Sequence, residues 1–377
     1  MTTDLLTTNP ETLAPLRDVE RLLARQMKAL QGPGSAPVQR ARMANLVIFC
    51  NSLEQAGRIN AQLPEIEAVH PARALLVIGE PGHEEREVTA RVTVRPLLMA
   101  GGRAHALVEQ VTLHAGGAAV ERLPFAVRAL LIGDLPTNLW WAAPQPPPLA
   151  GPLLHDLSEN AQQIMYDSLG WEHPVRGVAA TASWLERIER AGAGGQWRVA
   201  SDLNWRRLKY WRRLLTQSLD PASAPGAAES VSEVTVEHGP HAVVQAWELG
   251  AWVSRRLGWR LHGGKVHDGV EIAWCFSTSQ GPRFVRVRRL EQGPPEVRRI
   301  RLACTLEGRP AALNFVVEEG GRRLAIQLEG VEGAPRTMTV PALSAAELIG
   351  RQLSDRERDP AFRESMAVAQ GMAQSLL

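Results

Sequence analysis

The chain has 377 residues, of which 45% are hydrophobic and 22% charged, and its formal net charge is +2. This length allows two domains with separate cores, and the near-neutral charge argues against a nucleic-acid-binding protein, whose domain is usually strongly basic. The sequence contains no run of eighteen apolar residues and does not open with a basic and then apolar leader. We therefore expect neither a membrane span nor a signal peptide. The widely spaced Cys50, Cys275 and Cys304 favour free thiols in a reducing cytoplasm.

The first half begins with alternating helix and strand signals. Ser52 followed by Gln55 is a capping-box pattern that opens a helix ending near Leu63. The apolar runs on either side of that helix predict two strands, and a strand, helix and strand in succession imply parallel pairing. In chain order the predicted elements are a helix over 13–30, a strand over 43–50, the capped helix and a strand over 74–78.

The middle of the chain adds a hairpin and further helix and strand alternation. Two alternating runs around Gly101 and Gly102 predict antiparallel strands. We therefore predict an α/β domain with a mixed sheet covered by helices. The elements are strands over 87–98 and 104–113, an amphipathic piece over 118–127, a strand over 129–132, an exposed proline-rich stretch over 144–152, a helix over 153–162, a strand over 163–166 and a helix over 175–190.

The segment 202–215 concentrates two Trp, one Tyr and five cations. Trp205 and Trp211 recur at helical spacing on one face, and Asp202 stands at the position of an N-cap. We predict a single helix that ends the first domain. Its apolar face would pack on the sheet, and its Arg-rich face would pair with a partner or face solvent.

A low-complexity stretch over 221–230 marks the best domain boundary. The sequence thus predicts an N-terminal α/β domain over 1–220, a linker over 221–230 and a C-terminal domain over 231–377. The second domain is expected to be α+β with an antiparallel meander, because short glycine-rich turns separate most of its strands. Its strands are predicted over 233–237, 270–277, 283–290, 297–307, 311–318 and 322–329, with helices over 242–257, from Ser344 and from Pro360.

The usual catalytic signatures do not occur in this sequence. There is no phosphate-binding P-loop, and no G-x-G-x-x-G follows the strand that ends at Cys50, so we do not expect a standard dinucleotide-binding fold. The H-E-x-x-H, C-x-x-C and G-x-S-x-G motifs are also missing. We therefore predict no catalytic residue, no cofactor and no metal ion.

Two further features could belong to a surface or to a core. Trp140 and Trp141 are adjacent, so on a regular element they point in different directions. One is expected to be buried and the other half-covered, or else to serve as an exposed anchor for a partner. In the second domain, alternation places Arg286 and Arg288 on one strand face, which is either a solvated surface or a surface for an anionic partner.

Five short motifs occur in a fixed order between about residues 40 and 220. Together they make the chain resemble the glucose-6-phosphate dehydrogenase assembly protein family, of the OpcA type found in cyanobacteria and actinobacteria. The motifs are Asn45-Leu-Val, His70-Pro-Ala-Arg73, Asp134-Leu-Pro-Thr-Asn-Leu-Trp-Trp141, Tyr166-Asp-Ser168 and Asp202-Leu-Asn-Trp205 with Leu208-Lys-Tyr-Trp-Arg212.

The resemblance implies a cytoplasmic protein without enzymatic activity. It would bind glucose-6-phosphate dehydrogenase, promote its active oligomer and raise its activity as an allosteric activator in the pentose phosphate pathway. No nucleic acid or membrane is expected as a partner. The residues that match the family motifs are partner-binding or structural candidates: His70, Arg73, Asp134, Pro136, Trp140, Trp141, Asp167, Ser168, Asp202, Trp205 and Trp211.

Two alternatives stay open at this point. Arg73, Asp167 and Ser168 could bind or transform a phosphorylated sugar at a sheet edge, because Arg is suited to phosphate. The helix over 202–215 could instead bind nucleic acid, which the net charge opposes.

Overall fold

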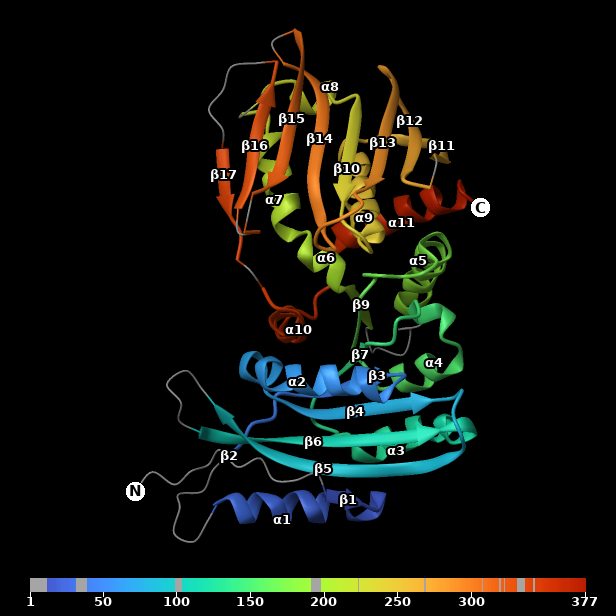
Figure 1. Ribbon diagram of the computed structural model, residues 1–377, viewed down its shortest axis with the longest axis vertical. Coiled ribbons are helices and arrows are strands. Elements are labelled where there is room, and N and C mark those ends of the chain that lie inside the picture. The colour runs from blue at the N-terminus through green and yellow to red at the C-terminus, as the bar shows by residue number, and fades with distance from the viewer. Residues whose placement is uncertain are drawn as a thin grey trace.

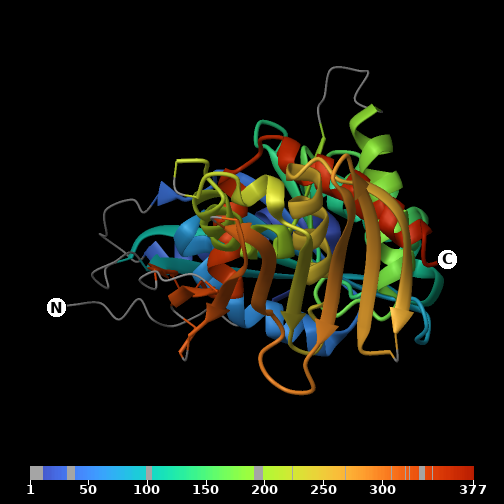
Figure 2. The ribbon, with the colours of Figure 1, turned by 90° about the horizontal axis from the view of Figure 1, so that it is seen from above.

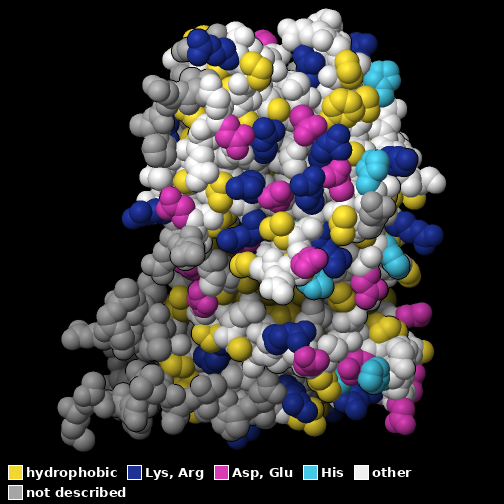
Figure 3. All heavy atoms as spheres, turned by 45° about the horizontal axis from the view of Figure 1, so that its top comes forward, with side chains coloured by type: hydrophobic (Ala, Val, Ile, Leu, Met, Phe, Trp, Pro, Cys, Tyr) yellow, Lys and Arg dark blue, Asp and Glu magenta, His cyan; other side chains and the backbone are white. Residues whose placement is uncertain are grey.

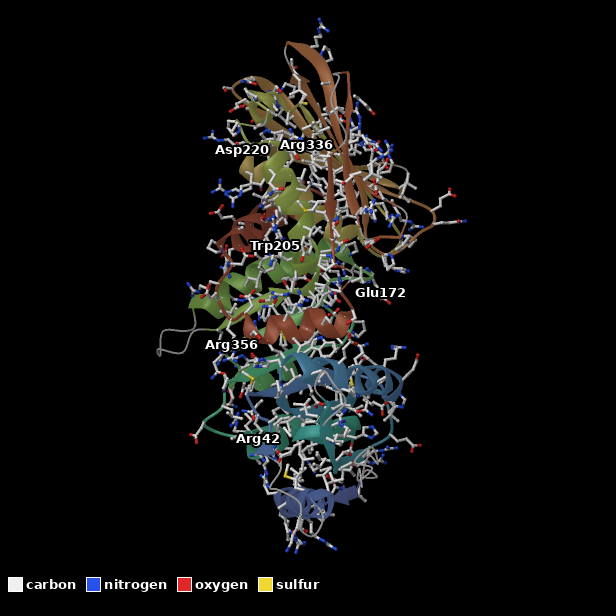
Figure 4. All side chains as sticks on the ribbon, turned by 90° about the vertical axis from the view of Figure 1, so that its left-hand side faces the viewer. Arg42, Glu172, Trp205, Asp220, Arg336 and Arg356 are labelled. Carbon is white, nitrogen blue, oxygen red and sulfur yellow. The ribbon has the colours of Figure 1, made fainter. Side chains whose placement is uncertain are left out.

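The chain folds around two sheets that lie one above the other along its long axis. The computed structural model describes residues 12–31, 39–98, 104–190, 198–222, 224–267, 269–306, 308–318, 320–321, 323–330, 336–341 and 343–377. Within this part, sheet A has nine strands and sheet B has eight, at the bottom and top of Figure 1. Trp205 lies at the level where the two halves meet (Figure 4). No described helix is both long and apolar enough to cross a membrane.

Sheet A is mixed, as predicted. Its strands run in the order β1-β5-β6-β4-β3-β7-β8-β9, with β2 paired to β6. The hairpin strand β5 is antiparallel to β6, and the residues expected to turn between them, Gly101 and Gly102, lie outside the described residues. The strands are β1 (Thr12–Ala14), β2 (Gln39–Arg40), β3 (Ala44–Cys50), β4 (Ala72–Glu80), β5 (Arg86–Leu98), β6 (Ala104–Gly116), β7 (Thr137–Trp141), β8 (Gln163–Tyr166) and β9 (Val199–Asp202).

Six parallel strands of sheet A have the order of a dinucleotide-binding fold. Numbered along the chain, β6-β4-β3-β7-β8-β9 reads 3-2-1-4-5-6, which is the doubly wound arrangement. Our expectation that this fold is absent was therefore wrong. The glycine motif is needed to bind a phosphate, so its absence does not exclude the fold. The strand order depends instead on the hydrophobic strands and on right-handed crossovers.

Helices cover both faces of sheet A. On one face, α2 packs over the sheet and α10 packs beside α2, and on the other face lie α1, α3, α4 and α5. Because α10 follows sheet B in the chain, the C-terminal segment completes the cover of the N-terminal sheet. These helices are α1 (Val19–Gln31), α2 (Leu53–Val69), α3 (Leu123–Leu130), α4 (Pro152–Ser158), α5 (Pro174–Arg190) and α10 (Ala345–Ser354), with short 3-10 turns at Leu16–Asp18, Gly117–Arg122 and Pro147–Leu149.

Sheet B is mostly antiparallel, which confirms the predicted α+β character. Its order is β11-β12-β13-β10-β14-β15-β16-β17, and only the central β10 and β13 pair in parallel. Its strands are β10 (Glu233–His238), β11 (Arg260–His267), β12 (Glu271–Thr278), β13 (Gly281–Arg289), β14 (Val297–Leu306), β15 (Arg309–Val317), β16 (Arg323–Glu329) and β17 (Arg336–Thr339). Its helices are α7 (Lys209–Ser218), α8 (Ala227–Ser230), α9 (Val243–Arg256) and α11 (Pro360–Gln374).

Several predicted elements differ in detail. The strand expected over 129–132 does not form, because its first two residues end α3, where Leu130 is buried. A four-residue apolar run fits a helix end as well as a strand. The helix from Ser52 passes through Pro64 and ends at Val69. Burial of Ile66 and Leu63 offsets the hydrogen bond lost at the proline.

The Trp-rich segment is also different from the single helix we expected. It forms α6 (Leu203–Arg207) and then α7, with a break at Leu208. Asp202 caps α6 as predicted, accepting a hydrogen bond from the Asn204 amide. The prediction that its apolar face packs on the N-terminal sheet was wrong in large part, since Trp205 packs on Phe362 of α11. Figure 1 shows α7 behind β16 of sheet B.

Candidate functional site where the two sheets meet

Five of the motif residues converge at the carboxyl ends of β8 and β9. The Asp202 carboxylate accepts hydrogen bonds from the backbone N–H groups of Ser168 and Asn204, at 3.2 and 2.8 Å. The Asn204 side chain in turn donates to the Ser168 hydroxyl at 2.8 Å. These contacts hold the end of β8 against the start of α6, so Asp202 and Ser168 join two neighbouring strands and the helix that follows.

Asp167 in the same cluster holds a guanidinium group. Arg207 donates two hydrogen bonds to the two carboxylate oxygens of Asp167, at 2.8 and 2.7 Å. Such a two-point pair fixes the guanidinium and carboxylate groups relative to each other and is stronger than a single hydrogen bond between them. The pair closes the loop after β8 onto α6.

Trp205 links this cluster to the C-terminal helix. Its indole N–H donates to the carboxylate of Asp359 at 2.6 Å, and the same carboxylate caps α11 by accepting from the Phe362 amide. The Trp205 and Phe362 rings are 5.4 Å apart. The Arg212 guanidinium lies 3.5 Å from the Trp205 ring centre, a cation–π contact, and burial lowers the pKa of Arg212 to about 10.

A fully buried acidic group lies behind these residues. Glu248 of α9 is 1% exposed, and its carboxyl group interacts with that of Asp202. Burial, followed by repulsion from Asp202, raises the pKa of Glu248 well above its ordinary range. Burial, followed by the charge of Asp167, raises the pKa of Asp202 to about 7. Burial and mutual repulsion therefore shift both acids toward their protonated forms. Both lie where the N-terminal and C-terminal halves of the chain meet.

Two cavities open beside α6. The larger, about 400 Å³, lies between α6, α7 and the rim of sheet B, and Arg206, Arg207, Tyr210, Trp211 and Gln245 are among its lining residues. The smaller, about 200 Å³, is lined by side chains that include Asp202, Trp205, Arg212 and Asp359.

The remaining motif residues lie elsewhere. His70 and Arg73 are at the amino end of β4, the opposite end of sheet A from Asp167. The His70 ring is 3.3 Å from the Ser354 hydroxyl of α10, and burial lowers the pKa of His70. Arg73 is 2% exposed and paired with Glu20 and Glu109. The structure does not bring Arg73 together with Asp167 and Ser168.

Asp134 and Pro136 lie in the turn before β7. Asp134 is exposed, and the carbonyl of Pro136 accepts a hydrogen bond from the Asn45 amide at 2.8 Å. The Asn45 side chain donates to the carbonyls of Ile132 and Leu135, so it ties this turn to the first residues of β3.

Trp140 and Trp141 are both buried, at 7% and 2% exposure, which contradicts the expectation that one would be half-covered. Trp140 joins the cluster under α2 and α10, whereas Trp141 stacks on Phe49 at 4.5 Å on the opposite face. Adjacent side chains can both be buried when each face of a sheet is covered.

Sequence reasoning missed Glu248, Arg207 and Asp359 as members of the cluster. Glu248 had a detectable signal, because it is a lone acid between Trp247 and Leu249 in an otherwise apolar stretch of helix. Asp359 had a weaker one, as a cap before Pro360. Arg207 had none, because its partner Asp167 is 40 residues away in the chain.

The carboxyl end of β3, where a doubly wound fold binds a dinucleotide phosphate, carries a side-chain cap in this chain. The Ser52 hydroxyl accepts the Gln55 amide at 3.2 Å, and the Gln55 side chain donates to the carbonyl of Ala142. The exposed acid Glu54 stands in the first turn of α2. Asn51 reaches across to Gln145 at 3.4 Å, so the crevice between β3 and β7 is bridged. A negative side chain and occupied amides both disfavour a bound phosphate.

The architecture is a doubly wound sheet followed by an open, mostly antiparallel sheet. A crystal structure from Parabacteroides merdae, provisionally described as an oxidoreductase, matches with a TM-score of 0.53 and 9% identity, over 89% of this chain and 99% of that one. At this identity the likeness concerns the fold alone.

The family is shown by sequence comparison. Residues 64–183 match the glucose-6-phosphate dehydrogenase subunit N-terminal domain, and residues 198–366 match the corresponding C-terminal domain. The chain belongs to the glucose-6-phosphate dehydrogenase assembly protein family of the OpcA type.

Two relatives carry the provisional name OxPP cycle protein OpcA. The chain is 27% identical to the one from Nostoc punctiforme over 81% of its own length and 65% of that protein. It is 24% identical to the one from Synechocystis over 97% of its length and 79% of that protein. The chain thus spans less than two thirds of the Nostoc relative.

Proposed function

We propose that this protein is a non-enzymatic assembly factor that binds glucose-6-phosphate dehydrogenase, promotes its active oligomer and raises its activity. It would act by binding one conformation or oligomer of the dehydrogenase more tightly than the others. Family membership supports the link to that enzyme and to the oxidative pentose phosphate pathway.

One observation carries the proposal that the chain itself is not a dehydrogenase. The helix that would receive the pyrophosphate is preceded by Asn51-Ser52 rather than by glycines. The Gln55 amide in its first turn bonds to the Ser52 hydroxyl, and the Asn51 amide just before the helix bonds to the Gln55 side chain. The fold supplies a stable framework, while side chains of the chain itself bridge the crevice where doubly wound folds bind a dinucleotide. Such a framework suits a protein that acts through its surface.

The test is co-purification with the dehydrogenase of the same organism, followed by an activity assay with and without this protein. We expect a complex on size-exclusion chromatography and a several-fold rise in dehydrogenase activity. A dehydrogenase that neither binds nor responds at micromolar concentration would refute the proposal.

The buried tryptophans require a control that separates folding from binding. Trp205 and Trp211 are 5% and 7% exposed, so replacing both by Ala is expected to unfold the junction and abolish activation indirectly. Circular dichroism reports this. The matched surface variant is Phe125→Ala, because Phe125 is 75% exposed on α3, and it is expected to keep the fold. A folded Trp205→Ala, Trp211→Ala variant that no longer activates would place these side chains at the partner surface.

One observation still supports binding of a sugar phosphate, although with other residues than the three named from the sequence. Arg73 is too distant to serve, but the cavity of about 400 Å³ offers Arg206 and Arg207 beside Tyr210. Both guanidinium groups are already paired, to Asp355 and Asp167. Calorimetry with millimolar glucose 6-phosphate, repeated on Arg206→Gln, tests this candidate, and absence of heat in the wild type would dismiss it.

A further inference from the structure

One face of sheet B is uncovered in the described structure. Figures 1 and 2 show α7, α9 and α11 behind this sheet and none of the described helices in front of it. Successive side chains along these strands therefore alternate between buried and partly exposed positions. In β10, Val234 and Val236 are fully buried against the helices, while Glu233, Thr235 and Glu237 point the other way and are partly exposed. An open face of this width is a surface available to another molecule.

Charges of both signs are interleaved on the open face. Figure 3 shows Arg and Lys side chains alternating with acidic ones over the upper part of the molecule. The strand register places four of them in one row across β12, β13, β10 and β14: Glu271, Arg288, Glu237 and Arg299. Neighbours in this row are 2.9, 3.8 and 3.9 Å apart, so they are ion pairs along the sheet. The signs read minus, plus, minus, plus.

A row with this sequence of signs is complementary to its own reverse. Two-fold rotation about a line parallel to the strands, midway between β13 and β10, brings Glu237 opposite Arg288 of a second copy and Arg299 opposite Glu271. A face of a single sign would require an oppositely charged partner, whereas this row has no net charge and matches itself. The signs therefore favour a second copy of this chain over a strongly charged partner.

The neighbouring positions fit the same rotation. The next row across these strands holds Ala273, Arg286, Thr235 and Arg301. The rotation brings Arg286 opposite Thr235 of the second copy and Arg301 opposite Ala273, so each long side chain faces a short one. Two sheets packed face to face lie about 10 Å apart.

The area is that of a small specific interface. The rotation places β13 over β10, β12 over β14 and β11 over β15, so six strands overlap. Six strands at about 4.8 Å spacing and about six residues at about 3.4 Å give roughly 600 Å² on each partner. The total of about 1,200 Å² is at the lower end of the range for specific protein interfaces.

We propose that the open face of sheet B is a homodimer interface, formed about a two-fold axis between β13 and β10 and selected by the row Glu271, Arg288, Glu237 and Arg299. This surface is independent of the proposed function, because it concerns the chain alone. Each Arg of the row then contacts an acid in its own sheet and another in the partner's sheet. Networks of this kind specify register more than they add affinity.

The experiment is complementation between two variants of the full chain. One carries Arg288→Glu with Arg299→Glu, so its row is all negative, and the other carries Glu237→Arg with Glu271→Arg, so its row is all positive. We expect the wild type to sediment as a dimer at micromolar concentration. Each variant alone should be monomeric, with a Kd raised at least tenfold, and an equimolar mixture should recover the dimer.

The control is Arg255→Glu on α9, because Arg255 pairs with Glu364 on the helix side of sheet B and should leave the dimer intact. Circular dichroism checks that both row variants are folded. If either is not, the variant Glu237→Gln with Glu271→Gln, which removes only the two acids, replaces it and should weaken the dimer. A monomeric wild type, dimeric row variants or a mixture that stays monomeric would each overturn the proposal.

Discussion

Sheets A and B differ in how many of their faces are covered, and this difference organises the whole molecule. β3 and β4 of sheet A are buried at every position, as expected for parallel strands between two helical layers. β10 and β14 of sheet B alternate between buried and partly exposed residues. Sheet A is thus enclosed between helices, whereas sheet B leaves one face accessible in the described part of the chain.

The largest expected effect tests whether sheet A depends on the C-terminal segment. A fragment ending at residue 220, where the sequence predicts the first domain to end, lacks α10. It would expose the α2 surface and the side chain of Trp140, which α10 helps to cover. We expect this fragment to aggregate or to unfold without a cooperative transition, measured by light scattering and thermal melting.

The matched control keeps the complete chain and carries a protease site in the predicted linker, near Pro225. After cleavage the two pieces should stay together on a gel-filtration column. A soluble and cooperative 1–220 fragment would instead show that the sequence-based boundary is also an energetic one.

The second prediction compares one aromatic residue from each sheet. Trp140→Ala removes a buried ring between α2, α10 and sheet A, so the free energy of unfolding should fall by about 3–5 kcal/mol. Phe284→Ala on the open face of sheet B should cost about 1 kcal/mol or less in the monomer, since Phe284 is only partly buried. Urea denaturation measures both, and equal losses would contradict the contrast between the sheets.

The sequence predicted individual strands and helix caps better than it predicted which elements pack against one another. Continuous apolar strands such as Ala44–Cys50 and alternating ones such as Glu233–His238 were recognised from their periodicity. The helix start at Ser344 and the cap at Asp202 were predicted because both signals are local. The cover of α2 by α10 was not, because no local pattern connects segments nearly 300 residues apart.

The same limit applies to the candidate site. Asp167, Ser168 and Asp202 were picked out by motif resemblance, and the structure joins them. Trp205 was assigned to the wrong layer, since its partners Asp359 and Phe362 lie at the far end of the chain. A helical periodicity identifies the apolar face of a helix but not the element on which that face packs.

The third prediction concerns pH at the junction of the sheets. Because the pKa of Asp202 is raised from 3.8 to about 7 in the folded chain, the folded state binds more protons than the unfolded state between about pH 4 and 7. The free energy of unfolding should therefore fall as pH rises through this window, by about 1–4 kcal/mol. Asp202→Asn keeps an acceptor for the Ser168 and Asn204 amides, so it should be folded and should make the slope shallower. Burial also raises the pKa values of Glu248 and Glu67, so their part of the slope should remain.

Urea denaturation at several pH values measures this effect. Asp134→Asn, at an exposed position, is the control and should keep the wild-type slope. If Asp202→Asn retained the same dependence on pH, the charge of Asp202 could not be its source.

The smallest expected effect is a difference in thiol reactivity between the two sheets. Cys50, at the end of β3, is fully buried, and burial raises its pKa to about 12, so very little reactive thiolate exists at neutral pH. Cys275 lies on the open face of sheet B and is partly exposed. Iodoacetamide should therefore modify Cys275 first in the dilute protein, as followed by mass spectrometry. At concentrations that favour the proposed dimer, Cys275 should become protected while Cys50 stays unreactive, because only the open sheet gains a cover from a second copy. Faster labelling of Cys50 would mean that the carboxyl end of β3 opens to solvent, and the enclosed character assigned to sheet A would then be wrong.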